Sequence, residues 1–343
     1  APMGPNVENF EKEIASYLDI GFAAALSSGT AALHLALKII GVKENDFVFC
    51  SDLTFVASVN AIKYLNANPV FIDSELSSWN MCPKSLDKAL KIYKPKAVVV
   101  TDIYGQSADY IELRKICNKY KVPIIEDSAE SLGAEYNNKK CGTFGDISIL
   151  SFNGNKIITT GGGGMMVSNN EHFVKRARKL STQAKDSCLH YEHSEVGYNY
   201  RLSNILAGIG IGQLKTLDIF VEKRRNIFKY YKDCLRMHEN IQFMPEIKNG
   251  YSTFWLSALL IKNFNHSDIE RLINNFFEEK IEARPIWKPM HQQPIFKNDP
   301  FIFAGVRPNS DYLFEHGLCL PSGYELSNDD LDRIISVLKK EVN

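Results

Sequence analysis

Six short apolar runs recur between residues 22 and 150 of this 343-residue chain, and helical patterns separate most of them. The runs are continuously apolar and rich in Val, Ile and Phe, which is typical of strands that are covered on both faces. Alternation of such strands with helices indicates βαβ units and a parallel sheet. The strands are predicted at 22–26, 47–50, 69–72, 97–100, 123–126 and 147–150, and the helices at 30–40, 55–65, 83–91 and 110–119.

The second half of the chain is less regular. A long helix is predicted over residues 201–236, with an interruption at the small-residue cluster 207–212, and we interpret it as the hinge between two domains. The predicted domains are therefore residues 1–236 and a smaller α+β domain at 237–343. The other predicted elements are strands at 165–167 and 253–261, helices at 171–180, 268–277 and 329–341, and a polar stretch at 181–199.

The charge balance excludes several function classes. Lys and Arg number 40 and so do Asp and Glu, so no basic excess attracts nucleic acid or acidic lipid. The densest apolar stretch, residues 254–261, is far shorter than the roughly 20 residues that cross a bilayer. Seven scattered cysteines favour reduced thiols over a disulfide framework or a zinc site. We expect a cytoplasmic protein with no nucleic-acid partner, no membrane segment and no metal.

Polar and small residues follow two of the predicted strands, where ligands bind in open parallel sheets. The segment 27–30, Ser-Ser-Gly-Thr, opens a helix and suits a phosphate, although Ser and Thr also cap helices in general. Asp127 and Glu130 follow the strand at 123–126. A buried carboxylate there needs a cationic partner or hydrogen-bond donors, and a helix cap is the alternative.

Lys156 lies in a turn-rich loop after the strand at 147–150 and before the apolar pair 157–158. A desolvated lysine there would have a lowered pKa and act as a nucleophile, whereas most lysines are solvated surface groups. The glycine run 161–164 has neither the spacing of a dinucleotide-binding turn nor that of an ATP-binding loop.

Five segments in this order resemble the DegT/DnrJ/EryC1/StrS family of pyridoxal 5′-phosphate (PLP)-dependent sugar aminotransferases. The resemblance covers nearly the whole chain, and it implies the α/β type I PLP aminotransferase fold. That fold has a mostly parallel central sheet between helices and a smaller C-terminal α+β domain. The segments are Ser-Gly-Thr-Ala-Ala-Leu-His at 28–34, Asp-Leu-Thr-Phe-Val-Ala-Ser at 52–58, Glu-Asp-Ser-Ala-Glu at 126–130, Ser151 to Gly161, and Gly-Tyr-Asn-Tyr-Arg at 197–201.

The resemblance implies a role for each matching residue. Lys156 matches the lysine that bonds to PLP and then moves a proton. During the reaction PLP alternates with its amino form, PMP. Asp127 matches the carboxylate on the pyridine nitrogen. Phe55 matches the aromatic residue that stacks on the ring, although a core Phe would look the same. Phosphate contacts are implied for Gly29, Thr30 and Ser151.

Two departures and one subunit contact accompany these matches. Glu130 stands where many members carry His or Gln beside the cofactor's 3′-oxygen, so an acid changes that contact or the protons available. The turn at 159–164 lacks the Glu of the commoner family pattern. Asn199 matches a residue that the second subunit contributes, which implies a homodimer with a shared active site.

The segment 283–294 resembles the loop that faces the sugar nucleotide in members acting on UDP-linked 4-keto-6-deoxy-N-acetylhexosamines. Arg and Lys pair with a diphosphate, while Trp and Met supply apolar area. A proline-stiffened loop that packs Trp287 into the core is the alternative interpretation. The substrate-binding residues are predicted to be Arg284, Trp287, Lys288, Met290 and His291.

These features predict transfer of an amino group from L-glutamate to the C4 ketone of such a sugar, as in bacillosamine-type glycan synthesis. Two alternatives remain at this point. One is a PLP-dependent sugar dehydrase, although that branch of the family carries His in place of the lysine, so Lys156 favours transamination. The other is a noncatalytic sugar-nucleotide sensor of the same fold.

Overall fold

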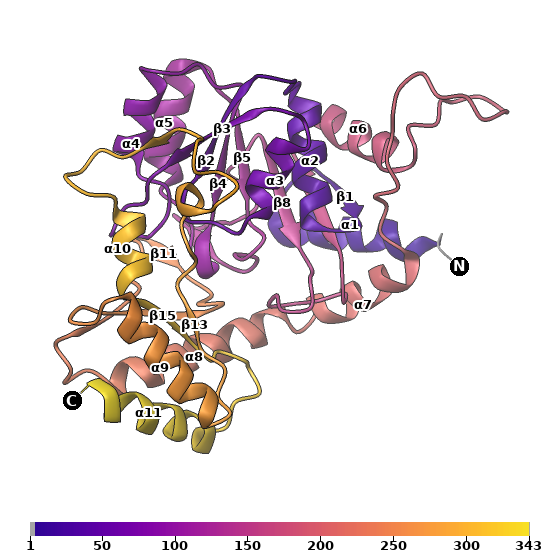
Figure 1. Cartoon of the computed structure of the whole chain (residues 1–343). Helices are drawn as coiled ribbons and strands as arrows, with labels where there is room; N and C mark the ends of the chain where they lie inside the picture. The colour runs from indigo at the N-terminus through magenta and orange to yellow at the C-terminus, as the bar shows by residue number, and fades with distance from the viewer. Residues whose placement is uncertain (1–3, 343) are drawn as a thin grey trace.

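The computed structural model describes residues 4–342 and contains a large eight-stranded sheet at its centre (Figure 1). All strands but one run in the same direction, and β9 is antiparallel to both of its neighbours. The strands lie in the order β1 (Phe22–Leu26), β9 (Gly164–Ser168), β8 (Ile147–Ser151), β5 (Ile124–Asp127), β4 (Ala97–Thr101), β2 (Phe47–Ser51), β3 (Asn68–Ile72) and β14 (Phe301–Ile302). The predicted mostly parallel sheet is confirmed.

Helices cover both faces of this sheet because its strands are apolar on both sides. In β4, Ala97 and Val99 pack into one buried cluster while Val98 and Val100 pack into another. The first cluster lies under α2 (Gly29–Ile40), α3 (Ala57–Lys63) and α6 (Glu171–Ser181). The opposite face is covered by α1 (Pro5–Leu18), α4 (Pro83–Leu90), α5 (Tyr110–Tyr120) and α7 (Asn204–Leu214).

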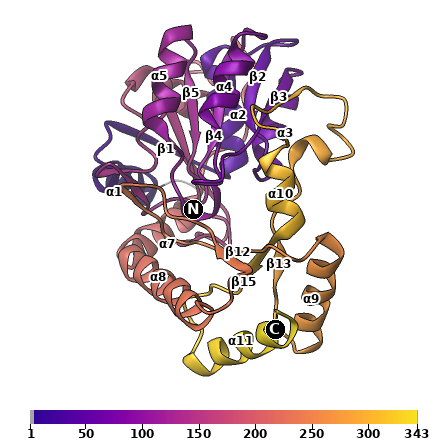
Figure 2. The same ribbon diagram turned by 90° about the vertical axis from the view of Figure 1, so that its left-hand side faces the viewer.

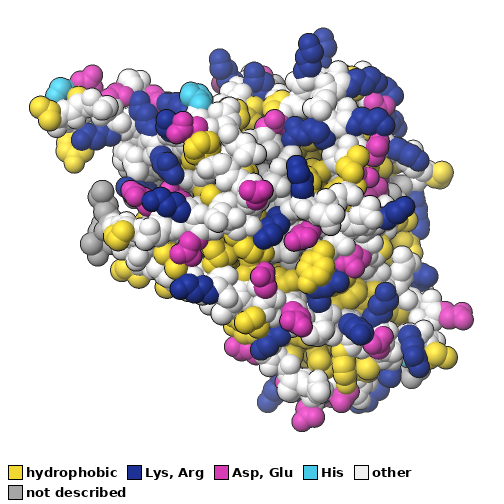
Figure 3. All heavy atoms as spheres, turned by 180° about the vertical axis from the view of Figure 1, so that it is seen from behind, with side chains coloured by type: hydrophobic (Ala, Val, Ile, Leu, Met, Phe, Trp, Pro, Cys, Tyr) yellow, Lys and Arg dark blue, Asp and Glu magenta, His cyan; other side chains and the backbone are white. Residues whose placement is uncertain are grey.

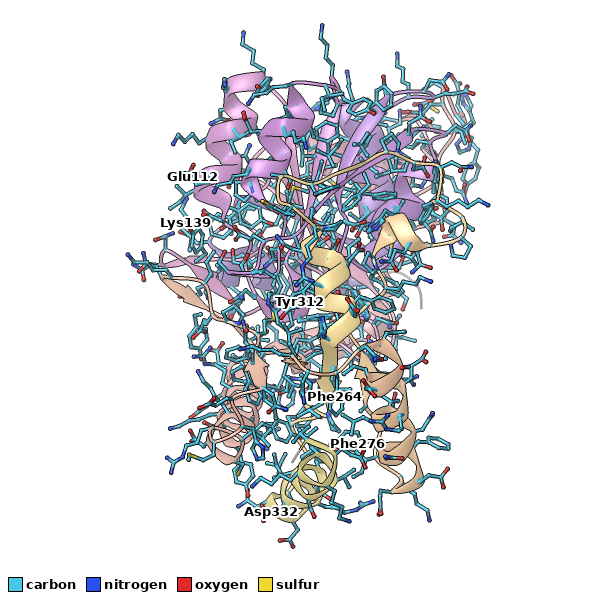
Figure 4. All side chains as sticks on the ribbon, turned by 60° about the vertical axis from the view of Figure 1, so that its left-hand side comes forward. Glu112, Lys139, Phe264, Phe276, Tyr312 and Asp332 are labelled. Atoms are coloured by element: carbon cyan, nitrogen blue, oxygen red, sulfur yellow. The ribbon has the colours of Figure 1, made fainter. Side chains whose placement is uncertain are left out.

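The C-terminal part of the chain builds a second, antiparallel sheet below the first (Figure 2). Its strands lie in the order β10 (Ile241–Phe243), β12 (Ser257–Ile261), β15 (Gly317–Leu320) and β13 (Arg284–Pro285). A separate hydrophobic cluster joins this sheet to three helices, α8 (Leu217–Cys234), α9 (His266–Glu278) and α11 (Asn328–Val342). Figure 4 marks this region by Phe264, Phe276 and, on α11, Asp332.

Three connections join the two parts of the molecule. A small sheet pairs β11 (Gly250–Tyr251) with β6 (Glu135–Tyr136) and β7 (Lys139–Lys140). Strand β14 is contributed by the C-terminal part but pairs with β3 of the large sheet. Helix α10 (Asn309–His316), which carries Tyr312, lies between the two parts in Figure 4. The domain boundary at residue 236 stays a prediction.

The expected interruption at residues 207–212 is wrong. These residues lie inside α7, and the break comes at residues 215–216, where α7 and α8 meet at 60°. Gly210 serves packing instead, because a Cβ there would lie 2.6 Å from the ring of Phe10 on α1. The strand predicted at 253–261 also begins later, at Ser257, because Phe254 has a left-handed φ of 45°.

All seven cysteines are free thiols, as expected. In the part of the chain that the structure describes, no single helix is long and apolar enough to cross a membrane. Only the bent pair of α7 and α8 meets that requirement, by combined length and composition.

Two glycines of α7 allow a matched test of this packing. Gly212→Ala meets no atom within 4 Å and should stabilise the protein by about 1 kcal/mol through helix propensity. Gly210→Ala should destabilise it, because overpacking against Phe10 costs about 1–3 kcal/mol and exceeds that gain. Urea unfolding of both variants measures the difference, and an equal effect of the two changes would contradict the packing role of Gly210.

Candidate active site

A cavity of about 500 Å³ opens at the carboxyl ends of β1, β5 and β8. Because parallel strands end at the same edge of a sheet, residues far apart in the sequence meet there. The cavity brings together most of the residues that the sequence predicted, namely Gly29, Thr30, Phe55, Asp127, Glu130, Ser151, Lys156 and Trp287.

Lys156 reaches the cavity from the loop after β8, and its side chain is only 13% exposed. Its Nζ lies 3.9 Å from Oε1 of Glu130 and 4.0 Å from the ring centre of Trp255. The indole Nε1–H of Trp255 donates to the carbonyl of Asn155 at 2.8 Å, which holds the two segments together. Burial lowers the pKa of Lys156, although the charges of Glu130 and Asp127 oppose the shift. Desolvation makes this amine a nucleophile.

Asp127 ends β5 and is buried at the floor of the cavity. Its Oδ2 accepts a 2.6 Å hydrogen bond from Ser58 Oγ, and Oδ1 accepts one from the N–H of Ala129 at 3.2 Å. The Ser58 hydroxyl also lies 3.0 Å from Thr54 Oγ1, which is 2.7 Å from Thr101 Oγ1. Burial raises the pKa of Asp127, while these donors and the charge of Lys156 lower it. These hydrogen bonds orient the Asp127 carboxylate, which can accept a further hydrogen bond.

Glu130 is buried on the turn after β5, and its carboxylate lines the cavity. Its Oε2 accepts a 2.7 Å hydrogen bond from the backbone N–H of Tyr104, while Oε1 faces Lys156. Burial raises the pKa of Glu130 to about 7, against the opposing charge of Lys156. At neutral pH this carboxyl can therefore hold or release a proton beside the lysine.

The N-terminus of α2 forms the opposite wall of the cavity. Ser28 caps the helix, because its Oγ accepts from the N–H of Ala31 at 3.0 Å. A Cβ at Gly29 would lie 3.1 Å from the Cβ of Ser151, and a Cβ at Gly164 would collide with the backbone of Ser28. Gly29 thus allows the helix end to lie against β8, and Gly164 allows it to lie against β9. Its free N–H groups and dipole suit a phosphate.

Aromatic rings stand over this floor. The Phe55 side chain is 56% exposed, and its ring centre lies 5.6 Å from that of Trp287. The backbone N–H of Trp287 donates to the Tyr104 hydroxyl at 2.9 Å. A buried lysine, a buried carboxylate, aromatic rings and a helix N-terminus thus line one cavity. The residues present therefore suit PLP.

The remaining predicted residues lie outside this cavity. Arg284 is exposed and forms an ion pair with Glu282 at 2.7 Å, and Lys288 is exposed. Met290 is buried in the core of the large domain, and His291 contacts two aspartates. Asn199 is exposed beside the loop after α6, which projects from the body in Figure 1. Their assigned roles stay predictions.

We did not predict three residues of the site from the sequence, namely Ser58, Tyr104 and Trp255. Ser58 lies within a segment that carried the family resemblance, and its position one helical turn after Thr54 was a usable signal. Tyr104 and Trp255 follow no motif, and Trp255 reaches the cavity only through tertiary packing.

The projecting loop also contains Cys188, His190 and Glu192, whose ligand atoms lie within 4.8 Å of one another. His190 and Glu192 already bond at 2.8 Å, and both are exposed. The expectation that the protein needs no metal stays a prediction.

The pairing of Glu130 with Lys156 predicts a shift in lysine reactivity. Glu130→Gln removes a negative charge that raises the pKa of Lys156, so the midpoint for covalent labelling of Lys156 should move to lower pH. Mass spectrometry of the labelled peptide over pH 6–11 measures it, with Glu135→Gln as the control. An unchanged midpoint in Glu130→Gln would show that the carboxylate does not act on the lysine.

Comparison with known proteins places this geometry in a family. The model of the DegT/DnrJ/EryC1/StrS aminotransferase family matches residues 1–339. A Bacillus subtilis relative, EpsN, is 51% identical over 98% of this chain and 88% of its own length, and its name describes a pyridoxal phosphate-dependent aminotransferase.

Two further relatives are named for products or substrates. GDP-perosamine synthase of Escherichia coli O157:H7 is 36% identical, with 96% of this chain and 88% of the relative covered. UDP-4-amino-4,6-dideoxy-N-acetyl-beta-L-altrosamine transaminase of Campylobacter jejuni is 32% identical, with 98% of this chain and 91% of the relative covered.

A solved structure confirms the fold. A DegT/DnrJ/EryC1/StrS aminotransferase from Brucella abortus superimposes with a TM-score of 0.91 at 28% identity, covering 99% of this chain and 91% of that one. With the lysine, carboxylate and helix terminus assembled in one cavity, the chain belongs to the DegT/DnrJ/EryC1/StrS aminotransferase family and is a PLP-dependent sugar aminotransferase.

Proposed function

We propose that this protein transfers the amino group of L-glutamate to the C4 ketone of a UDP-linked 4-keto-6-deoxy-N-acetylhexosamine. The product is a UDP-4-amino-4,6-dideoxy sugar of the kind used in bacillosamine-type glycan synthesis. The observation that carries the proposal is the desolvated Lys156 amine, which faces Glu130 and Asp127 across a cavity closed by the α2 terminus.

Five groups of this chain would hold PLP. The α2 terminus and Ser151 suit the phosphate, Asp127 the pyridine nitrogen, Phe55 the ring face and Lys156 the aldehyde carbon. When bound, PLP would supply an electron sink that makes the C–H bond beside an attached amino group acidic. The carboxylate of Asp127 would favour a protonated ring nitrogen, which that property requires.

Lys156 would accept and return the transferred proton at its Nζ. Burial lowers the pKa of this amine, which favours the neutral form that a base requires. Glu130 holds a proton within 3.9 Å of that nitrogen and can return it. Trp255 and Trp287 line the cavity and exclude water from the amine.

Two observations support a sugar nucleotide as the acceptor. Relatives over nearly the full chain are named for GDP-linked and UDP-linked amino sugars. The segment at 283–294 resembles that of members acting on UDP sugars, and it places Trp287 at the cavity with the exposed cation Lys288 beside it. Because of this resemblance, we propose a UDP-linked sugar rather than a GDP-linked one. The presence of Lys156, where the dehydrase branch has His, favours transamination over dehydration.

We also propose that two copies share each active site in the cytoplasm. The loop after α6 extends from the body and exposes Leu189, Tyr191 and Val196, which are apolar side chains suited to a subunit contact (Figures 1 and 3). Asn199 follows this loop and is exposed, so it is accessible to a partner's cavity.

The absorbance of the PLP-loaded protein tests the reaction. L-Glutamate alone should convert the visible cofactor band to a near-ultraviolet band, and UDP-4-keto-6-deoxy-N-acetylglucosamine should restore it. Lys156→Ala should lose at least 100-fold of the glutamate-dependent rate, because it removes the group that transfers the proton. Restoration by a GDP-linked 4-keto-6-deoxyhexose, with none by the UDP sugar, would contradict the proposed substrate.

Mixed subunits test the shared site. Lys156→Ala and Asn199→Ala proteins, each inactive as homodimers, should recover up to a quarter of wild-type activity after exchange, because half of the dimers are then mixed and each mixed dimer holds one intact site. Native mass spectrometry confirms that mixed dimers form. No recovery in such dimers would show that Asn199 acts within its own subunit.

A further inference from the structure

Two loops from distant parts of the chain meet beside the active site at Asp52. This residue follows β2 and is fully buried. Its carboxylate accepts hydrogen bonds from the backbone N–H of His291 at 2.9 Å, from Nδ1 of that imidazole at 2.8 Å and from Ser310 Oγ at 2.6 Å. Its carbonyl accepts another from the N–H of Met290 at 2.9 Å.

The other side of the imidazole faces a second carboxylate. His291 Nε2 lies 3.1 Å from Oδ1 of Asp311 on α10, which also accepts from Gln292 Nε2 at 2.6 Å. The imidazole stacks on Phe301 of β14 with centres 3.9 Å apart and planes at 3°. An imidazole can donate from both nitrogens only when it is protonated, so this geometry fits an imidazolium between two acids.

These contacts control where two aromatic side chains stand. Asp52 is three residues before Phe55, and His291 is four residues after Trp287. The rings of Phe55 and Trp287 lie 5.6 Å apart and both line the active-site cavity. The hydrogen bond from Trp287 N–H to Tyr104 anchors the other end of the same segment. The Asp52–His291 contact therefore joins the two loops that carry the aromatic walls.

We propose that His291 is a positioning residue that holds Trp287 at the active-site cavity by bridging Asp52 and Asp311 as an imidazolium. This positioning task differs from the direct substrate contact expected for His291, which stays a prediction. The proposal rests on the proposed function only in that the cavity is the active site, and it is independent of the sugar that binds there.

The bridge has a defined dependence on pH. Burial alone would lower the pKa of His291, but the hydrogen bonds and charges of Asp311 and Asp52 outweigh it and raise the pKa to about 9. The facing charges come from the loop after β2 and from α10, while Ser310 and Phe301 add no charge. Because the folded pKa lies above the ordinary value of 6.5, the bridge is complete below about pH 6.5 and is lost as pH rises through 9.

Fluorescence of Trp287 in the full-length chain, before cofactor is added, tests the proposal. Trp255→Phe leaves two tryptophans in the chain, Trp79 and Trp287. Because Trp79 is fully buried, quenching of the fluorescence by acrylamide reports on Trp287. In this background, the quenching constant should rise at least twofold between pH 8 and 10, with a midpoint near 9. His291→Gln should show the raised constant already at pH 7 and no transition.

Two further variants keep the test decisive. Asp311→Asn retains an acceptor but loses the charge, so its midpoint should fall toward 6.5 while the fold is kept. Lys156→Met should leave the midpoint unchanged. Quenching of His291→Gln equal to the parent at pH 7, or an unmoved midpoint in Asp311→Asn, would overturn the proposal. Since no substrate is present, failure to aminate a sugar would leave this result unaffected.

Discussion

Everything at the site depends on keeping one lysine out of water beside two buried carboxylates. Burial lowers the pKa of Lys156, and the charges of Glu130 and Asp127 oppose but do not cancel this shift. Such a balance requires that each carboxylate be oriented by its own donors, Ser58 for Asp127 and the Tyr104 N–H for Glu130. Without these donors, the buried negative charges of the two carboxylates would repel one another, which would favour protonation of the carboxyl groups.

The sheet provides this arrangement because its parallel strands end at a single edge. Asp127 ends β5, the loop of Lys156 follows β8, and α2 begins directly after β1. Residues more than 100 positions apart thus converge without any long-range motif. The segment before β12 contributes Trp255, and the segment after β13 adds Trp287, so the cavity is complete only when both parts of the chain are in contact.

The sequence predicted the central strands to within one residue, because a strand covered on both faces is a continuous apolar run bounded by turns. Helix α1 was missed although Val7, Phe10, Ile14 and Leu18 recur at helical spacing after Pro5. Gly210 of α7 resembled part of a hinge because its packing partner, Phe10, is 200 residues away in the sequence. The contact between His291 and Asp52 could not be predicted, because the two residues are 239 positions apart and no local pattern links them.

Catalysis by this site requires that Lys156 be the residue that bonds to PLP. Borohydride reduction of the PLP-loaded protein, followed by proteolysis and mass spectrometry, identifies that residue. We expect one phosphopyridoxyl group per chain, on the peptide that contains Lys156, and none in Lys156→Ala. A label on another lysine, or no label in protein that has taken up PLP, would contradict this expectation.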